Sequence, residues 1–255
     1  MYINTKTADS FVTICRKMDA TDAMSLKPIR THGKFADAAY EAIRTGIRMG
    51  HIPPGTRLHE HELAAELGTS KTPVREALGR LVADGLATTS GRAGIYVTRL
   101  SQVETADLYE ARGIIEPPLA RLAAERASDE DIEALRKSLN EFQAALDADD
   151  VDALMELDSQ FHELIASIAG NRMLSEARER LDNCIAIARV SSVRRAHRRT
   201  STQALKEHTA IYNAIAERKA KLAERRMAAH IRKRRDGLLG RSHGAEQRTG
   251  MAARA

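Results

Sequence analysis

The apolar residues of this chain recur every three to four positions along most of its length, which is the period of an amphipathic helix. Residues 34–50 follow this period and stop at Gly50, and the period returns from Val103 to about Leu239. Only 86–89 and 95–98 look like strands, on either side of a turn with two glycines. The pattern predicts a mainly α fold with one small hairpin. The apolar stripe of the first helix consists of Ala38, Ala39, Ala42, Ile43 and Ile47.

Residues 57–86 predict two short helices joined by a tight turn. The first helix covers about 59–67 and ends at Gly68, a residue that tolerates positive φ. Ser70 or Thr72 then offers a hydroxyl N-cap, and Pro73 would occupy the first helical position. The second helix has an apolar stripe on one face and basic and hydroxyl side chains on the other. This is the pattern of a helix-turn-helix whose second helix enters the DNA major groove.

A helix before this motif and a hairpin after it predict a winged helix-turn-helix. Arg75 is the candidate for base readout, through O6 and N7 of guanine. We expect phosphate contacts from Thr72, Lys71 and Arg57 and, at the wing tip, from Arg92. The remaining candidates for DNA contact are Arg80 and Gly94.

The sequence over these elements resembles the DNA-binding domain of the GntR family of bacterial transcription regulators. The resemblance covers about 36–98 and is carried by GHIPPGTRL, by ELAAELGTSKTPVREALGRL, and by DGL and GIYV. Two positions depart from the family pattern. Lys71 stands where arginine is usual, and His61 stands where some members use arginine toward DNA. Because lysine lacks the bidentate fork of arginine, base discrimination at Lys71 is expected to be looser.

The composition fits a helical protein of two domains. The chain has 255 residues, of which 43% are hydrophobic and 4% aromatic, without tryptophan. Cys15 and Cys184 lie far apart and match no disulfide or ligand pattern, which favours a reducing, cytoplasmic location. No apolar run approaches the roughly 18 residues of a membrane span, and no signal peptide is visible.

The formal charge of +5 hides a strong asymmetry: residues 99–170 carry −11 and residues 171–255 carry +13, whereas 34–98 carry only +1. Charge alone would place nucleic acid on the basic last third. The alternative, which we favour, is that these basic helices pair with the acidic segment within the bundle or across a dimer. No aromatic residues interleave with the basic ones to stack bases.

The period also predicts the domain boundaries. Residues 1–33 show no sustained period and are expected to form a disordered arm; a chain that began at Met24 would lose no assigned element. The remaining parts are a DNA-binding domain at 34–98, a linker at 99–102, an all-helical domain at 103–239 and a disordered tail at 240–255. In the helical domain we expect a first helix kinked at Pro117-Pro118, a helix capped at Ser128, and later helices at about 149–168, 172–190, 203–216 and 219–239.

One carboxylate and three imidazoles form a candidate metal site in the helical domain. Asp158 and His162 lie one helical turn apart on one face, and His208 and His230 each stand on the apolar face of another helix. Such a set suits Zn²⁺, Ni²⁺, Mn²⁺ or Fe²⁺. The alternatives are histidines satisfied within the core and a solvated Asp158–His162 pair. His197 lies in a basic run and is not expected to be a ligand.

The helical domain resembles the FCD ligand-binding domain of the FadR branch of the GntR family over about 103–236. The cues are LYEARGIIE, DSQFHELIASIAGN and two later histidines. The resemblance implies a metal held by an Asp-x-x-x-His pair and two histidines about 22 residues apart, as 208 and 230 are. It also implies that Arg112 grips an effector carboxylate beside the metal. The alternative for Arg112 is an ion pair with Glu110 or Glu116. Asn171 is the second effector candidate, and the alternative for it is a helix C-cap.

These observations together predict a DNA-binding transcription regulator, expected to be a repressor and not an enzyme. We expect a homodimer on a palindromic operator, since one winged helix reads only a half-site. The expected effector is a small carboxylate or sugar acid bound at the metal. Two alternatives remain: a regulator whose effector is the metal ion itself, and a metal-dependent enzyme. No general base stands beside the metal candidates, which weighs against the enzyme.

Overall fold

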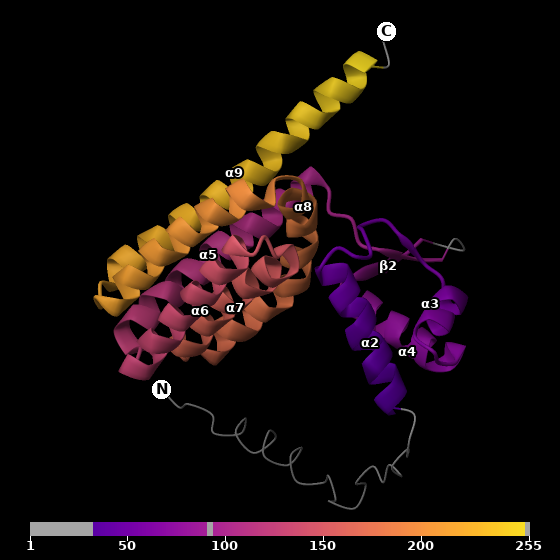
Figure 1. The fold of residues 1–255 in the computed structure, drawn as a ribbon, viewed down its shortest axis with the longest axis horizontal. Coiled ribbons are helices and arrows are strands. Elements are labelled where there is room, and N and C mark those ends of the chain that lie inside the picture. The colour runs from indigo at the N-terminus through magenta and orange to yellow at the C-terminus, as the bar shows by residue number, and fades with distance from the viewer. Residues whose placement is uncertain (1–32, 91–93, 253–255) are drawn as a thin grey trace, which may run out of the picture. The chain divides into compact units, whose positions relative to one another are not determined.

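The computed structural model describes the backbone of residues 33–90 and 94–252 and the side chains of this part except those of 191–197 and 241–252. Except for Gly33, the predicted N-terminal arm lies outside the described residues. The elements form a small N-terminal group of helices with a sheet and a larger group of helices, as the fold class predicted (Figure 1).

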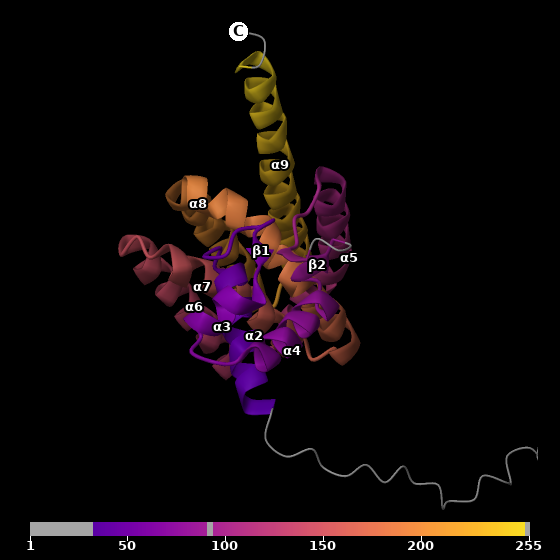
Figure 2. The same ribbon diagram turned by 90° about the vertical axis from the view of Figure 1, so that its right-hand side faces the viewer.

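The N-terminal group contains three helices: α2 (Gly33–Arg48), α3 (Glu60–Glu66) and α4 (Lys71–Ala83) (Figure 2). The predicted stripe of α2 was partly wrong, because Ala38 and Ala42 are exposed. The buried positions are Ala36, Ala39, Tyr40, Ile43 and Ile47. Their spacings of three, one, three and four residues keep them on one face of the helix, where Tyr40 supplies the bulk that two alanines would not.

The sheet has three short antiparallel strands in the order β1-β3-β2: β1 (Arg57–Leu58), β2 (Ala87–Thr89) and β3 (Ile95–Val97). In the wing hairpin Thr88 pairs with Tyr96. The sequence did not predict β1, because two residues are too few for an alternating pattern; Leu58 pairs with Ile95 in the register.

The turn between α3 and α4 differs in detail from the prediction. Gly68 has a φ of 62°, as a residue in the left-handed region should. Helix α4 begins at Lys71 with Ser70 as N-cap, and the Ser70 side chain makes no capping hydrogen bond. Pro73 is therefore the third helical residue and not the first. It still lies in the first turn, where its missing N–H leaves no helical bond unmade.

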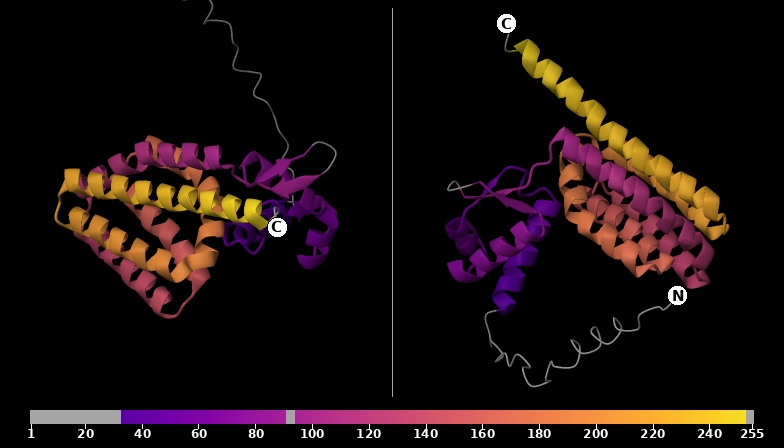
Figure 3. Two further views of the ribbon diagram at one scale, coloured as in Figure 1. Left: turned by 90° about the horizontal axis from the view of Figure 1, so that it is seen from above. Right: turned by 180° about the vertical axis from the view of Figure 1, so that it is seen from behind.

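The second group is a bundle of five helices, α5 to α9 (Figure 3). Helix α5 (Gln102–Arg126) packs along α9 and also contacts α7 and α8. Helix α5 continues through Pro117 and Pro118 without interruption. Helices α6 (Asp129–Asp147) and α7 (Val151–Ala169) pack against each other. A capping box predicted from Ser128 starts α6, in which Asp131 N donates to Ser128 Oγ and Ser128 N donates to the Asp131 carboxylate.

The last two helices are longer than predicted. One helix, α8 (Arg172–Ala216), replaces the two that were expected at 172–190 and 203–216. No glycine or proline lies between these two stretches, so nothing in the chain stops the helix. Helix α9 (Ala220–Ala252) extends beyond the expected end at 239 into the segment predicted to be a disordered tail.

The bundle has an apolar core that includes Phe161, Ile165, Ile211, Ile215 and Met227. Several basic residues of the last third pair with the acidic segment of the same chain, as favoured over nucleic-acid binding. Arg189 and Arg234 both contact Asp158, at 3.0 Å and 2.9 Å, and Arg198 lies 3.3 Å from Asp149. Within the described part of the chain, no helix is long and apolar enough to cross a membrane.

Candidate functional site

Helix α4 presents the residues predicted to contact DNA on its exposed face. Four apolar side chains anchor the opposite face in the N-terminal core: Val74, Ala77, Leu78 and Leu81. Lys71, Thr72 and Arg75 are exposed, as is His61 on α3. The first amides of a helix lack intrahelical acceptors, so this end of α4 also offers backbone donors to a phosphate.

Arg75 is already positioned by a carboxylate. Its Nε and Nη2 donate to the two carboxylate oxygens of Glu60, at 3.0 Å and 2.8 Å. This hydrogen bonding raises the pKa of Arg75 and lowers that of Glu60. The pair is exposed, so its contribution to stability is small. What it fixes is the direction of a planar guanidinium that carries five donors.

Arg80, another DNA-contact candidate, pairs with α2. Its Nη1 lies 2.5 Å from Asp37, and its guanidinium lies over the ring of Tyr40, 4.2 Å from the centroid. Nine residues separate Arg80 from Lys71, which at 3.6 residues per turn puts the two on opposite sides of α4. Arg80 thus ties α4 to α2, and a DNA contact by Arg80 stays a prediction.

The wing brings together Arg57 and Gly94. Gly94 has a φ of 117°, and a Cβ there would lie 3.1 Å from Arg57 Nε. The backbone conformation therefore favours glycine, and the Arg57 guanidinium would have to shift slightly to make room for a Cβ. Arg57 also lies over the ring of Tyr96, 6.0 Å from its centroid. Arg92, predicted at the wing tip, lies outside the described residues.

The three predicted histidines converge inside the bundle. His162 comes from α7, His208 from α8 and His230 from α9, and one ring nitrogen of each lies within 4.8 Å of the others. The ring centroids are 4.9–5.2 Å apart. All three side chains are buried, and Phe161 stacks on His208 at 4.2 Å. We call these three residues the histidine cluster.

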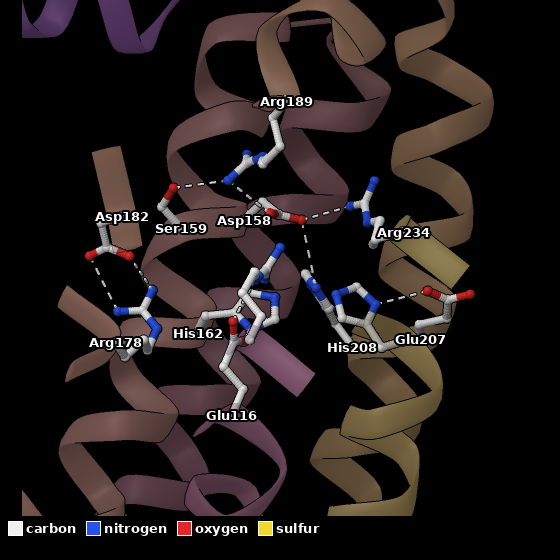
Figure 4. A network of polar contacts seen from close by, with 12 residues as sticks. Glu116, Asp158, Ser159, His162, Arg178, Asp182, Arg189, Glu207, His208 and Arg234 are labelled. Carbon is white, nitrogen blue, oxygen red and sulfur yellow. Dashed lines mark hydrogen bonds and ion pairs between the residues drawn. The ribbon is translucent and has the colours of Figure 1, made fainter. Parts of the chain in front are cut away.

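Carboxylates orient two of the three rings. Glu116 Oε2 lies 2.7 Å from His162 Nδ1, and Glu207 Oε2 lies 2.8 Å from His230 Nδ1 (Figure 4). These contacts leave Nε2 of each ring for another partner, an arrangement found around metal-ligating histidines. Burial lowers the pKa of His230 to about 4 and that of His208 well below its usual value. Both rings are therefore neutral near pH 7, the form that binds metal.

Unpaired nitrogens mark the centre of the cluster. Within the described part of the chain, His162 Nε2 and both ring nitrogens of His208 are buried without a hydrogen-bond partner. A buried polar atom without a partner costs about 1–3 kcal/mol. A divalent ion bound by the three imidazoles would satisfy such nitrogens. The donor set therefore fits a metal of the kind that the sequence predicted.

Asp158, the fourth predicted ligand, has other partners. Arg189 Nη1 lies 3.0 Å from Oδ2, Arg234 Nη2 lies 2.9 Å from Oδ1, and His208 Nε2 lies 3.6 Å from Oδ1. Burial alone would raise the pKa of Asp158, but the two guanidiniums hold it well below its usual range. Asp158 thus borders the histidine cluster as a carboxylate whose charge two arginines neutralise.

The predicted effector residue Arg112 lies in the same interior but is paired. Its Nε donates to Glu116 Oε1 at 2.6 Å, and both side chains are at most 4% exposed. Burial opposes ionisation of Glu116, but Arg112 and His162 hold its pKa well below the usual range. The side chains form a chain from Arg112 through Glu116 to the histidine cluster, so the alternative of a pair with Glu116 is observed.

Asn171 is an N-cap and not a C-cap. Gly170 takes the left-handed conformation that ends α7, with a φ of 59°. Asn171 then starts α8, and its Oδ1 accepts from Leu174 N at 3.2 Å. A role at the effector pocket remains a prediction.

Sequence reasoning did not identify four residues around the cluster as functional: Glu116, Arg189, Glu207 and Arg234. Arg234 follows His230 by one helical turn, which is a usable signal. Glu116 was noted only as a partner of Arg112. For Arg189 and Glu207 no signal existed, because their contacts lie on other helices.

Comparison with known proteins identifies two matching domains. Residues 35–97 match the family described as bacterial regulatory proteins, gntR family, and residues 107–233 match the FCD domain. The chain is 34% identical to the "Nta operon transcriptional regulator" of Aminobacter aminovorans over 197 residues, which cover 76% of this chain and 90% of the relative.

A second relative and a solved structure have similar coverage. The "HTH-type transcriptional repressor RspR" of Escherichia coli (strain K12) is 29% identical over 192 residues, 75% of this chain and 83% of the relative. The structure titled "E. coli McbR/YncC" shares the fold with a TM-score of 0.73 at 20% identity, covering 82% of this chain and 98% of that one.

The buried pair of Arg112 and Glu116 gives a prediction about stability. Arg112→Met should lower the free energy of unfolding by about 3–5 kcal/mol, because it leaves Glu116 buried without its main counter-charge. The double variant Arg112→Met/Glu116→Gln should recover most of this loss. Denaturant unfolding followed by circular dichroism measures both. Equal losses in the single and double variants would contradict the assignment of the cost to an unpaired buried charge.

Proposed function

Because this chain belongs to the GntR family of DNA-binding transcription regulators and carries an FCD effector-binding domain, we propose that it is a repressor controlled by a small organic acid at a metal ion. The family and its relatives are regulators and not enzymes, in agreement with the expectation from the sequence. The metal, the nature of the effector and the direction of regulation are the parts that we propose.

The convergence of three buried imidazoles supports the metal site most strongly. Three helices each place one histidine in the cluster, and among the described residues several of its buried ring nitrogens have no hydrogen-bond partner. Three imidazoles suit Zn²⁺, Ni²⁺, Mn²⁺ or Fe²⁺ and leave coordination positions open. FCD domains often bind metal, which is consistent with this proposal. When bound, the ion supplies a Lewis acid that attracts a carboxylate.

In this proposal Arg112 and Asp158 adjust the site to an acidic effector. Arg112 stands beside the cluster and pairs with Glu116, so an effector carboxylate would share or replace that partner. Asp158 is the candidate fourth ligand, and binding the ion would require it to loosen its contacts with Arg189 and Arg234. Such an exchange of partners makes effector binding sensitive to small shifts of α8 and α9, from which both arginines come.

DNA recognition in this proposal depends on Arg75. Its guanidinium would leave Glu60 or share it while contacting guanine, with Lys71 and Thr72 on nearby phosphates. Two copies of the chain would read the two halves of a palindromic operator, since a two-fold dimer matches a two-fold site. Effector binding must favour one of two arrangements of the dimer to change operator affinity.

A second candidate is a regulator that senses the metal ion itself. The pairing of Arg112 with Glu116 favours this reading, because the arginine is already neutralised without an organic acid. Operator affinity measured with metal alone, in a buffer free of carboxylates, separates the two candidates.

The metal proposal predicts the effect of removing one imidazole. His208→Ala should weaken zinc binding by at least the roughly 10–100-fold that loss of an outer-shell partner costs. Zinc should raise the melting temperature of the wild-type protein but not that of the variant. His197→Ala is the control and should bind zinc like the wild type. Elemental analysis and competition with a chelating dye measure binding; zinc bound equally by the His208 variant would reject the site.

The recognition proposal predicts the effect of removing Arg75. Arg75→Ala should lower affinity for the operator by about 5–150-fold per half-site, since a bidentate base contact contributes about 1–3 kcal/mol. Affinity for a scrambled duplex should change much less. The operator is first obtained by selection from random duplexes, and anisotropy of a labelled duplex at physiological salt gives both affinities. Arg136→Ala, an exposed arginine paired with Glu133 on α6, is the control. Unchanged discrimination in the Arg75 variant would refute base readout.

A further inference from the structure

A cationic cavity opens between α8 and α9, on the outer side of the histidine cluster. Its volume is about 310 Å³, at the lower end of the range for small-molecule sites. Four cations contribute to its wall, Arg189, Arg199, Lys233 and Arg234, and one carboxylate, Glu207. Tyr109 and Leu238 add apolar surface.

The wall of the cavity carries more positive charge than the nearby carboxylates neutralise. Lys233 lies 3.2 Å from Glu207, and Arg189 and Arg234 share the single carboxylate of Asp158. Arg199 is exposed and makes no hydrogen bond or ion pair within the described part of the chain. Among the described residues, the four cations of the wall thus face two carboxylates, those of Glu207 and Asp158.

A hydroxyl group adds a neutral donor to the same wall. Thr200 lines the cavity, and its buried Oγ1 has no hydrogen-bond partner among the residues that the structure describes. A buried hydroxyl without a partner costs free energy that a bound acceptor recovers. Arg199 and Thr200 both line the cavity, so one guanidinium and one hydroxyl can serve the same group. This pairing of donors is suited to the oxygens of a carboxylate or a phosphate.

The cavity and the histidine cluster share walls. Arg189, Glu207 and Arg234 line the cavity, and each also contacts a residue of the cluster or Asp158 (Figure 4). The cavity therefore lies next to the histidine cluster, with Arg189, Arg234 and Glu207 common to both.

We propose that the cavity between α8 and α9 is a second anion subsite, so that the effector carries two separated anionic groups, one held at the histidine cluster and the other by Arg199 and Thr200. This inference rests on the proposed function, because it assigns the first group to the metal. A molecule with one carboxylate leaves the surplus charge and the Thr200 hydroxyl unsatisfied. A dicarboxylate, or a sugar acid with a phosphate at its far end, satisfies both.

Calorimetry on the zinc-loaded, full-length protein tests the subsite. Malonate, succinate and glutarate are each compared with the monoamide of the same acid, and 6-phosphogluconate is compared with gluconate. At least one dianion should bind about tenfold or more tightly than its matched monoanion, since a charge-assisted hydrogen bond contributes about 1.5–3 kcal/mol. The two arms show whether the second group is a carboxylate or a phosphate.

Two variants locate the effect. Arg199→Ala and Thr200→Val should reduce the advantage of the dianion to less than about threefold, while zinc affinity stays unchanged. Arg198→Ala is the matched control, because Arg198 pairs with Asp149 instead of lining the cavity. A dianion advantage that survives Arg199→Ala, or no advantage for any dianion, overturns the subsite.

The same titrations separate this inference from the proposal on which it rests. If monoanions bind only when zinc is present and dianions gain nothing, the metal-anchored effector stands and the second subsite is overturned. If a dianion binds equally well after chelation, and Arg199→Ala still weakens it, the subsite is supported and the metal anchor fails.

Discussion

The helical domain is organised by the need to give buried polar groups their partners. Three imidazoles, two carboxylates and three guanidiniums lie in the interior of the bundle, where an unpaired charge is costly. Arg112 balances Glu116, and Arg189 and Arg234 balance Asp158. Among the described residues, this pairing leaves imidazole nitrogens at the centre of the cluster without a hydrogen-bond partner. A metal ion is a suitable partner for these nitrogens. Its binding or loss would affect α5, α7, α8 and α9, which carry the paired residues and the histidines.

The DNA-binding domain is organised more simply, around an apolar core. Its apolar core fixes α4 in place, so the exposed end of the helix is presented with little freedom. Few charges are used for recognition, because the domain is nearly neutral overall. Affinity is therefore expected to come from a few placed donors and, in the proposed dimer, from pairing of two copies. In the last third, Arg189 is buried against Asp158, whereas Arg198, Lys219 and Lys233 are exposed.

Local pattern predicted what depends on local physics. The helical period, the glycine turns and the capping serine at Ser128 gave most helices and the wing. Spacing and family resemblance together predicted the three histidines that converge. The pattern failed where contacts between helices decide the outcome: it did not indicate that Arg80 would contact Asp37 and Tyr40 of α2, and nothing near Arg189 in the sequence indicates that it would meet Asp158. The predicted helix ends at 190 and 239 also differ from the structure, in which α8 and α9 continue beyond them; between 190 and 203 no glycine or proline stops the helix.

In the proposed mechanism, a metal ion in the histidine cluster makes operator binding depend on an acidic effector. Anisotropy of a labelled operator tests it, with the best-binding acid titrated into zinc-loaded and chelator-treated protein at equal ionic strength. We predict that the acid releases the operator from the zinc-loaded protein and leaves the affinity of the chelated protein unchanged. Release at the same acid concentration in both would contradict a metal-anchored effector.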